Sequence, residues 1–269
     1  QGAGDQGVMI GYACDETKQL MPMPVVLANR IVRELSACRQ SSYIQGILPD
    51  GKAQVTVEYE NGKPVRLDSV VVSCQHTEDK NLKKLEAEIR KKVLLPALRL
   101  LPPDEDTKIL INPSGRFVCG GMDADTGLTG RKLMVDSYGS MVPHGGGAFS
   151  GKDCSKVDRS AAYMARYIAK NIVAAGLASK CQVSLAYAIG VAQPVMVQVD
   201  TFGTGNVCAD DCLELAIPLV FGLTPKQIVD SLRLTRPIFR QTAAFGHFGR
   251  KEFPWERTGK VEALRNAVI

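Results

Sequence analysis

Several features that mark large protein classes are missing from this 269-residue sequence. It has no run of about 18 apolar residues, so a membrane-spanning helix is not expected. Its eight cysteines include no CxxC pair and its three histidines lie far apart, which favours reduced thiols over disulfides or a zinc site. The net charge is only +5, and the short basic cluster Arg90-Lys91-Lys92 is typical of a solvated helix face rather than a nucleic-acid-binding patch.

The start of the sequence lacks the marks of a targeting segment. Residues 1–7 contain no initiator Met, no basic region and no apolar region, so they are not a signal peptide. They are glycine-rich and polar, as in a loop within a longer chain, and we expect the sequence to be a fragment. Together with the reduced thiols, this favours a cytoplasmic protein.

Hydrophobic periodicity predicts strands and helices that alternate along the chain. The Asn61-Gly62 dipeptide between two alternating segments is a strong hairpin signal, and Pro24 opens a helical pattern of apolar residues. Pro218 is expected to end one helix early. Predicted strands span residues 7–14, 53–60, 65–74, 108–112, 116–119, 182–189 and 195–201, and predicted helices begin near residues 24, 82, 157, 210 and 224. Hairpins outnumber βαβ crossovers, which indicates an α+β fold with helices on one face of mixed or antiparallel sheets.

The segment 145–153 is the most informative part of the sequence. Residues 146–152 fit the pattern G-x-x-x-x-G-K, in which glycines let backbone N–H groups approach phosphate oxygens and the Lys adds a positive charge. The next position, which carries Ser or Thr in a nucleotide P-loop, is Asp153. This mismatch disfavours an ATP-dependent kinase with a standard P-loop. A different phosphate-binding loop, or a flexible turn with no ligand, remains open.

The surroundings of this segment favour the phosphate-binding alternative. Arg131 and Lys132 precede it, Lys152 lies within it, and Lys156 follows just before a predicted helix. A helix N-terminus itself attracts anions, so these cations are gathered where a polyanion would bind.

Six segments resemble the S-adenosylmethionine synthetase (methionine adenosyltransferase) family of bacterial type, with its N-terminal portion lacking. The stretch His-Gly-Gly-Gly-Ala-Phe-Ser-Gly-Lys-Asp at 144–153 is the most specific of them. The others are Gly-Ala-Gly-Asp-Gln-Gly at 2–7, Gly-Leu-Thr-Gly-Arg-Lys at 127–132, Lys-Val-Asp-Arg-Ser-Ala-Ala-Tyr at 156–163, Tyr-Ala-Ile-Gly-Val-Ala at 187–192 and Gly-His-Phe-Gly-Arg at 246–250. The resemblance runs from the first residue to the region of Trp255.

The resemblance implies three similar α+β domains related by pseudo-threefold symmetry, of which the central one would span residues 1–120 and the C-terminal one residues 121–269. It implies a homodimer or homotetramer with active sites between two subunits. The implied reaction joins ATP and L-methionine: the methionine sulfur attacks C5′ of ATP, and the released triphosphate is hydrolysed to phosphate and pyrophosphate. Two Mg²⁺ per site and K⁺ are the implied cofactors. Neither a nucleic acid nor a membrane is an implied partner.

Site residues carry over by position in the matching motifs. The resemblance places Asp50 and Lys52 against ATP, and Arg116 and Phe117 beside the adenine, with Phe117 stacked on the base. Asp125 would contact both substrates. From the residues alone, Phe117 is more often a core aromatic than a platform for a base, and the Asp50-Gly51 turn needs no ligand.

The triphosphate-binding positions of the family match Arg131, Lys132, Ala148 and Lys152, of which Lys152, Arg131 and Lys132 are the expected catalytic residues. A thioether nucleophile has no proton to lose, so this reaction requires alignment and charge stabilisation rather than a general base. Such a task suits clustered cations. His247 is expected to have a structural role.

Three further matches complete the expected site. Lys156 matches a lysine on the methionine side, Asp158 a magnesium ligand and Asp5 an acid near the methionine. Two segments depart from the family pattern: residues 120–125 lack a usual Pro and Gly before Asp125, and residues 141–143 are unusual. The missing N-terminal portion leads us to expect that the fragment alone is inactive. A non-catalytic nucleotide-binding or regulatory subunit of the same fold is the alternative.

Overall fold

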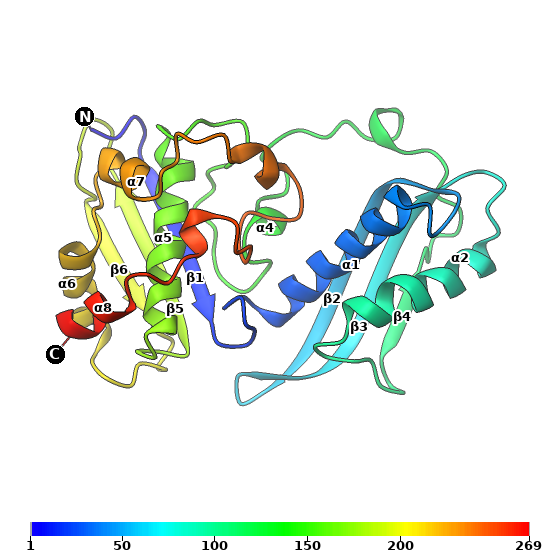
Figure 1. Ribbon diagram of the computed structural model, residues 1–269, viewed down its shortest axis with the longest axis horizontal. Helices are drawn as coiled ribbons and strands as arrows, with labels where there is room; N and C mark the ends of the chain where they lie inside the picture. The colour runs from blue at the N-terminus through cyan, green and yellow to red at the C-terminus, as the bar shows by residue number, and fades with distance from the viewer. Residues whose placement is uncertain (1, 269) are drawn as a thin grey trace. The chain divides into compact units, whose positions relative to one another are not determined.

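The computed structural model describes residues 2–268, which form two compact units. Unit 1 comprises Gln1–Pro22 and Thr129–Ile269, and unit 2 comprises Met23–Leu128. Each unit has its own three-stranded sheet, ordered β1-β5-β6 in unit 1 and β2-β3-β4 in unit 2 (Figure 1).

Unit 2 is built on a long hairpin. Strands β2 (Ile47–Glu60) and β3 (Lys63–His76) pair antiparallel, and β4 (Lys108–Ile111) adds to β3 in parallel. At the hairpin turn Asn61 and Gly62 have φ of 50° and 74°, the two left-handed residues of a type I′ turn. The sequence predicted this turn, and the strands on either side extend beyond their predicted ends.

Helices cover one face of the unit 2 sheet (Figure 1). They are α1 (Met23–Gln40), α2 (Leu82–Ile89), the π-helical turn η1 (Arg90–Leu94) and α3 (Leu95–Ala97). Leu27, Ile31 and Leu35 of α1 are buried against the sheet, as their spacing along one helix face requires. Burying this apolar stripe holds the two layers together.

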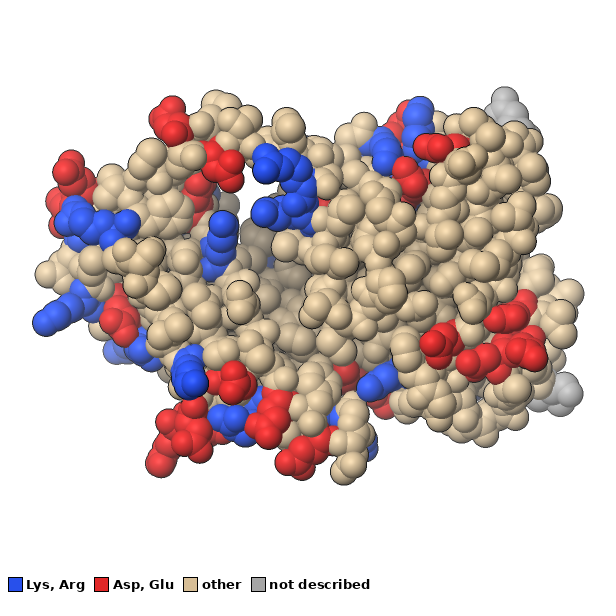
Figure 2. All heavy atoms as spheres, turned by 180° about the vertical axis from the view of Figure 1, so that it is seen from behind, with Lys and Arg blue, Asp and Glu red and all other residues tan. Residues whose placement is uncertain are grey.

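The basic residues at 90–92 lie on the surface of unit 2. Arg90 pairs with Glu86 at 2.9 Å, and Lys92 pairs with Glu88 at 3.3 Å while its ammonium also contacts the ring of Tyr43. Figure 2 likewise shows Lys and Arg interspersed with Asp and Glu on the visible face. The expected solvated helix face agrees with these pairings.

Unit 1 is organised around one buried helix on an antiparallel sheet of β1 (Gly7–Cys14), β5 (Lys180–Tyr187) and β6 (Met196–Asp200). Helix α5 (Val157–Ala174) packs on β1 and β5. A Cβ atom at Gly11 would lie 2.0 Å from the carbonyl carbon of Ala165, so glycine alone allows the helix to come this close to the strand. Gly176 follows the end of α5 with a φ of 73°, the left-handed conformation that the sequence predicted at this helix stop.

Shorter elements complete the molecule. Unit 1 also holds α4 (Leu133–Asp136), α6 (Asp210–Val220), α7 (Pro225–Ser231), η3 (Phe239–Ala243), η4 (Pro254–Glu256) and α8 (Val261–Ala267), and unit 2 holds η2 (Gly121–Asp123). No single helix within residues 2–268 has the length and hydropathy that a membrane span requires; α6 and α7 reach them only as a pair, bent by 75°.

A buried ion-pair cluster ties the segments of unit 1 together. The Arg166 guanidinium is fully buried and donates to the Glu256 carboxylate at 2.8 and 3.0 Å and to the carbonyls of Tyr12, Gln19 and Leu20. Lys170 donates to the same carboxylate at 2.7 Å. Burial alone would raise the pKa of Glu256, but these two cations lower it, so the carboxylate stays charged.

The structure confirms the α+β fold class and corrects two details of the sequence prediction. Residues 116–119 are not a strand, because the N–H of Phe117 donates to the ring of His76 instead of to a neighbouring strand. Pro218 does not end α6, which continues to Val220 with the proline inside it. The division into domains at residue 120 stays a prediction.

Candidate functional site

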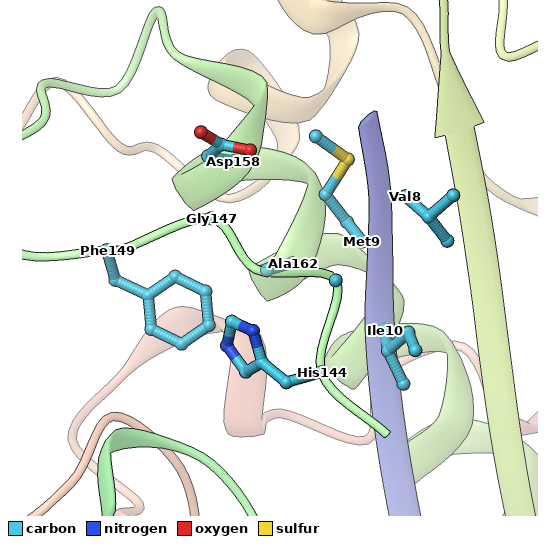
Figure 3. Close-up of a pocket in the computed structure, with 9 residues that line it drawn as sticks. Val8, Met9, Ile10, His144, Gly147, Phe149, Asp158 and Ala162 are labelled. Carbon is cyan, nitrogen blue, oxygen red and sulfur yellow. The ribbon is translucent and has the colours of Figure 1, made fainter. Parts of the chain in front are cut away.

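The glycine-rich segment 144–152 of unit 1 lies between β1 and the start of α5 (Figure 3). A Cβ atom at Gly145 would lie 1.6 Å from the carbonyl oxygen of Val8, and one at Gly147 would lie 2.3 Å from a carboxylate oxygen of Asp158. Gly146 has φ of 93°. Two of these glycines are therefore required by close contacts and one by backbone conformation, which explains the triplet.

Positive and negative groups meet at the end of this segment. The Lys152 ammonium donates to Asp158 at 2.7 Å, and the two side chains are 31% and 17% exposed. Within the described part of the chain, the backbone N–H groups of Gly147 and Ala148 donate no hydrogen bond to other residues. One ammonium and two uncommitted N–H groups are the donors that a phosphate group requires.

A second segment of unit 1, Thr129 and Gly130, lies against the first. A Cβ atom at Gly130 would lie 2.8 Å from the Cβ of Ala148, and the methyl group of Thr129 would lie 3.5 Å from one at Gly151. Arg131 and Lys132 follow directly and are exposed. The fold thus brings together two motifs that the sequence separates and that carry three of the expected cations.

Asp153, the residue that breaks the P-loop pattern, is paired with neighbours. Its carboxylate accepts hydrogen bonds from Lys156 Nζ at 2.8 Å and from the N–H of Ser155 at 2.7 Å. These bonds hold the pKa of Asp153 well below its usual range. Lys156 is therefore paired on the surface with Asp153. Asp5 is exposed, and its side chain accepts a bond from the N–H of Gln6.

A small pocket lies beneath the loop, with a cavity volume of about 10 Å³, the size of one water molecule. Figure 3 shows the His144 ring beside Phe149 on one side of it and Asp158 on another. The lining residues are Val8, Met9, Ile10, His144, Gly145, Gly147, Phe149, Asp158 and Ala162. Burial lowers the pKa of His144, and the Asp158 carboxylate opposes that shift.

A buried polar network supports the loop from behind, and sequence reasoning missed most of it. His247 Nε2 lies 3.3 Å from Ser150 Oγ, and its Nδ1 lies 2.8 Å from the hydroxyl of Tyr163. Arg159 donates to that hydroxyl and to the carbonyl of Lys152. Burial and the charges of Arg159 and Arg250 lower the pKa of His247 to about 3, so the ring is neutral near pH 7. Its full burial agrees with the expected structural role.

A separate group of expected site residues lies in unit 2, held by Gln75 and His76. Gln75 accepts a bond from the N–H of Asp50 and donates to the carbonyl of Val118. His76 accepts from the N–H of Phe117 at 3.0 Å through Nε2, and its own N–H donates to the carbonyl of Phe117 at 2.9 Å. The segment after residue 115 is thereby fixed next to the end of β3.

The other expected residues of unit 2 lie around this segment. The Asp50 carboxylate accepts from the N–H of Gly121 at 2.7 Å, and Gly121 in turn accepts from the N–H of Asp125 at 3.0 Å. Arg116 donates to the carbonyl of Glu78. Phe117 is half-buried, which leaves part of its ring open, and Lys52 is exposed on β2. Asp50, Phe117 and Asp125 are thus linked through one short network.

The acidic residue of the pocket fits a magnesium ion that is bound partly by the protein and partly by a substrate. Within residues 2–268, no group of three or more His, Cys, Asp or Glu side chains could hold a metal ion. Asp158 is the acid that lines the pocket beside the glycine loop. Magnesium often uses one or two carboxylates and otherwise the phosphates of a substrate. A single acid beside a phosphate-binding loop fits an ion that arrives with the phosphates.

Comparison with known proteins places the chain. The S-adenosylmethionine synthetase central-domain model matches residues 1–117, and the model of the C-terminal domain of that family matches residues 119–257. The chain belongs to the S-adenosylmethionine synthetase family. The S-adenosylmethionine synthase of Nocardioides sp. is 56% identical over 272 residues, covering 100% of this chain and 68% of that protein. The S-adenosylmethionine synthase of Desulforudis audaxviator is 56% identical over 268 residues, covering 99% and 68%.

Membership in this family of methionine adenosyltransferases settles the broad class of the chain as that of an enzyme. The matched residues include the glycine loop with Lys152 and Asp153, so the departure from the P-loop pattern lies within a domain of this family. The chain spans about two thirds of the length of both relatives.

Proposed function

We propose that this chain is part of an enzyme that makes S-adenosylmethionine from ATP and L-methionine. The methionine sulfur attacks C5′ of ATP, and the released triphosphate is hydrolysed to phosphate and pyrophosphate. The observation that supports this most directly is the glycine loop between β1 and α5, where Lys152, Asp158 and the free N–H groups of Gly147 and Ala148 meet. The choice of ATP and L-methionine as substrates rests on the family to which the chain belongs.

The chemistry needs little from the protein besides alignment and charge. The sulfur loses no proton, so no base is required at that atom, while negative charge grows on the leaving triphosphate. Lys152, Arg131 and Lys132 stabilise that charge, together with the N–H of Ala148. Asp158 would hold a magnesium ion, which would supply further positive charge against the phosphates. We propose two Mg²⁺ per site, and K⁺ as a second cofactor.

The residues of unit 2 bind the nucleoside part of ATP. The half-buried ring of Phe117 offers a face on which adenine stacks, and Arg116 lies next to it. Asp50 and Lys52 contact ATP, and Asp125 contacts both substrates. In unit 1, Lys156 and Asp5 lie on the methionine side; for Lys156 this requires that its ammonium leave Asp153, with which it is paired.

We further propose the assembly and location of the enzyme. It is a cytoplasmic homodimer or homotetramer with active sites between subunits, and it binds neither nucleic acid nor membranes. Its central domain comprises residues 1–120 and its C-terminal domain residues 121–269, with pseudo-threefold symmetry completed by an N-terminal domain. The 269-residue chain by itself is inactive, because about a third of the length of each relative lies outside the matched region.

Product formation tests these proposals. The complete gene product, supplied with ATP, methionine, Mg²⁺ and K⁺, should form S-adenosylmethionine detectable by mass spectrometry, and the isolated 269-residue chain should form none. If the complete gene product binds ATP yet forms no product, the alternative holds, namely a non-catalytic nucleotide-binding or regulatory subunit. Turnover by the isolated chain would refute its proposed inactivity.

A further inference from the structure

His144 makes a local hydrogen bond that usually belongs to other residue types. Its Nδ1 accepts from the N–H of Gly146 at 2.8 Å, two residues further along the chain. Asn and Asp commonly make this bond to residue i+2 and so form an Asx turn. Here an imidazole replaces the amide or carboxylate, at the first residue of the glycine loop.

The geometry fixes the state and position of the ring. Because an N–H group donates to Nδ1, that nitrogen carries no proton, and the neutral ring carries its proton on Nε2. Nε2 is buried and has no hydrogen-bond partner among the described residues. The ring lies beside that of Phe149 (Figure 3), with the two centroids 5.5 Å apart. Phe149 is itself packed against His247, at 5.1 Å between centroids. The aromatic network behind the loop therefore holds the ring in place.

The turn at Gly146 determines which donors of the loop remain available. Its N–H is used by His144, whereas the next two N–H groups, those of Gly147 and Ala148, donate to no other described residue. If the side-chain bond were lost, Gly146 with its φ of 93° would be free to change conformation, since glycine has few preferences of its own. The directions of the next two N–H groups would then no longer be fixed.

We propose that His144 is a positioning residue, which holds the turn at Gly146 through Nδ1 so that the N–H groups of Gly147 and Ala148 face a bound phosphate chain. This rests on the proposed function of the loop. His144 itself does not touch the phosphates. His144 orders the loop before the phosphates bind. What this requires is a side-chain acceptor at residue 144 for the N–H of Gly146.

Amide substitutions at His144 separate this role from general packing. In His144→Asn, the amide oxygen can accept from the Gly146 N–H as in an Asx turn. In His144→Gln, the same amide is one carbon further away, and in His144→Ala the acceptor is gone. Binding of inorganic tripolyphosphate with Mg²⁺, measured by calorimetry on the complete gene product, is the readout, with Lys152→Ala as a second reference variant.

We expect tripolyphosphate affinity to fall roughly tenfold in His144→Ala and in His144→Gln, the effect of about one hydrogen bond, and to stay within about threefold of wild type in His144→Asn. Equal affinities of the Asn and Gln variants would overturn the proposal, and this comparison still decides if the Ala variant does not fold. If wild type and Lys152→Ala bind tripolyphosphate equally, the proposed function of the loop fails. If Lys152→Ala is weakened while the Gln variant is not, only the role of His144 fails.

Discussion

The two units support their functional segments in different ways. Unit 2 fixes the segment around Phe117 with two buried polar side chains, Gln75 and His76, on top of an apolar layer. Unit 1 supports the glycine loop with Arg159 and His247 and contains the buried charges Arg166, Lys170 and Glu256. Among the described residues, every side chain of unit 2 that forms a salt bridge is at least partly exposed.

This difference shows that two similar layers of helix and sheet can depend on different forces. A core of apolar side chains is insensitive to pH, whereas buried ion pairs and a buried neutral histidine depend on the charge state of each partner. Unit 1 should therefore respond strongly to the removal of a buried charge, and unit 2, whose ion pairs are partly exposed, should respond much less.

The largest expected effect on stability is in the buried cluster. Glu256→Gln leaves Arg166 and Lys170 without a counter-charge and should lower the free energy of unfolding of unit 1 by roughly 3–5 kcal/mol. The fluorescence of Trp255, the one tryptophan of the chain, reports on this unit during urea denaturation. The matched variant Glu86→Gln, at an exposed pair in unit 2, should change stability by less than about 1 kcal/mol. Equal effects of the two variants would remove the contrast between the units.

The next effect concerns activity. Lys152→Ala should lower the turnover of the complete gene product by about 10²–10³-fold, because an ammonium group at the leaving triphosphate is lost. Lys226→Ala is a suitable control, since Lys226 is 77% exposed and pairs only with Asp230 among the described residues. Unchanged turnover in Lys152→Ala, measured as S-adenosylmethionine formed per minute, would refute the role of this lysine.

The smallest effect is a dependence on pH. The pKa of His247 is about 3 in the folded state and about 6.5 in an unfolded chain. The unfolded chain therefore binds the proton first as pH falls, so this stability is complete above pH 6.5 and is lost as pH falls toward 3. Between pH 7.5 and pH 5, the protonation of His247 alone should lower the free energy of unfolding by about 2 kcal/mol.

Two measurements check this pH dependence. Urea denaturation followed through Trp255 at both pH values gives the loss of stability, and NMR of the ring protons gives the charge state of His247 directly. A ring that titrates near pH 6.5 in the folded protein would contradict the burial argument.

Much of this architecture could be predicted from local patterns of residues. Burial largely alternates along the 14 residues on each side of Asn61-Gly62, with breaks at residues 51–52, 68–69 and 74–76, and the glycine loop was recognisable from its spacing. What local patterns could not give were contacts between distant residues. Ser150 and His247 lie 97 positions apart, and Gln75 meets Val118 across 43 positions. The residues around Ser150 and Gln75 in the sequence do not indicate which distant residue each contacts.

The segment 116–119 illustrates a second limit. Its residue types favour a strand, yet its N–H at Phe117 bonds to an imidazole rather than to a neighbouring strand. Strand propensity describes the local preference of the residues, but a β-sheet also requires a neighbouring strand to hydrogen-bond with. The roles of the site residues stay proposals for a related reason, since each depends on a ligand.

The pairing of β1 with β5 has a consequence for biosynthesis. Every residue of unit 2 lies between these two strands in the sequence, so β1 leaves the ribosome long before β5, its partner strand within residues 2–268, has been made. Translation at roughly 5–20 residues per second makes this delay many seconds. Throughout that time the apolar segment Val8–Ala13 lacks the hydrogen bonds that β5 later provides, and a nascent chain that stalls before residue 180 leaves that edge open to other chains.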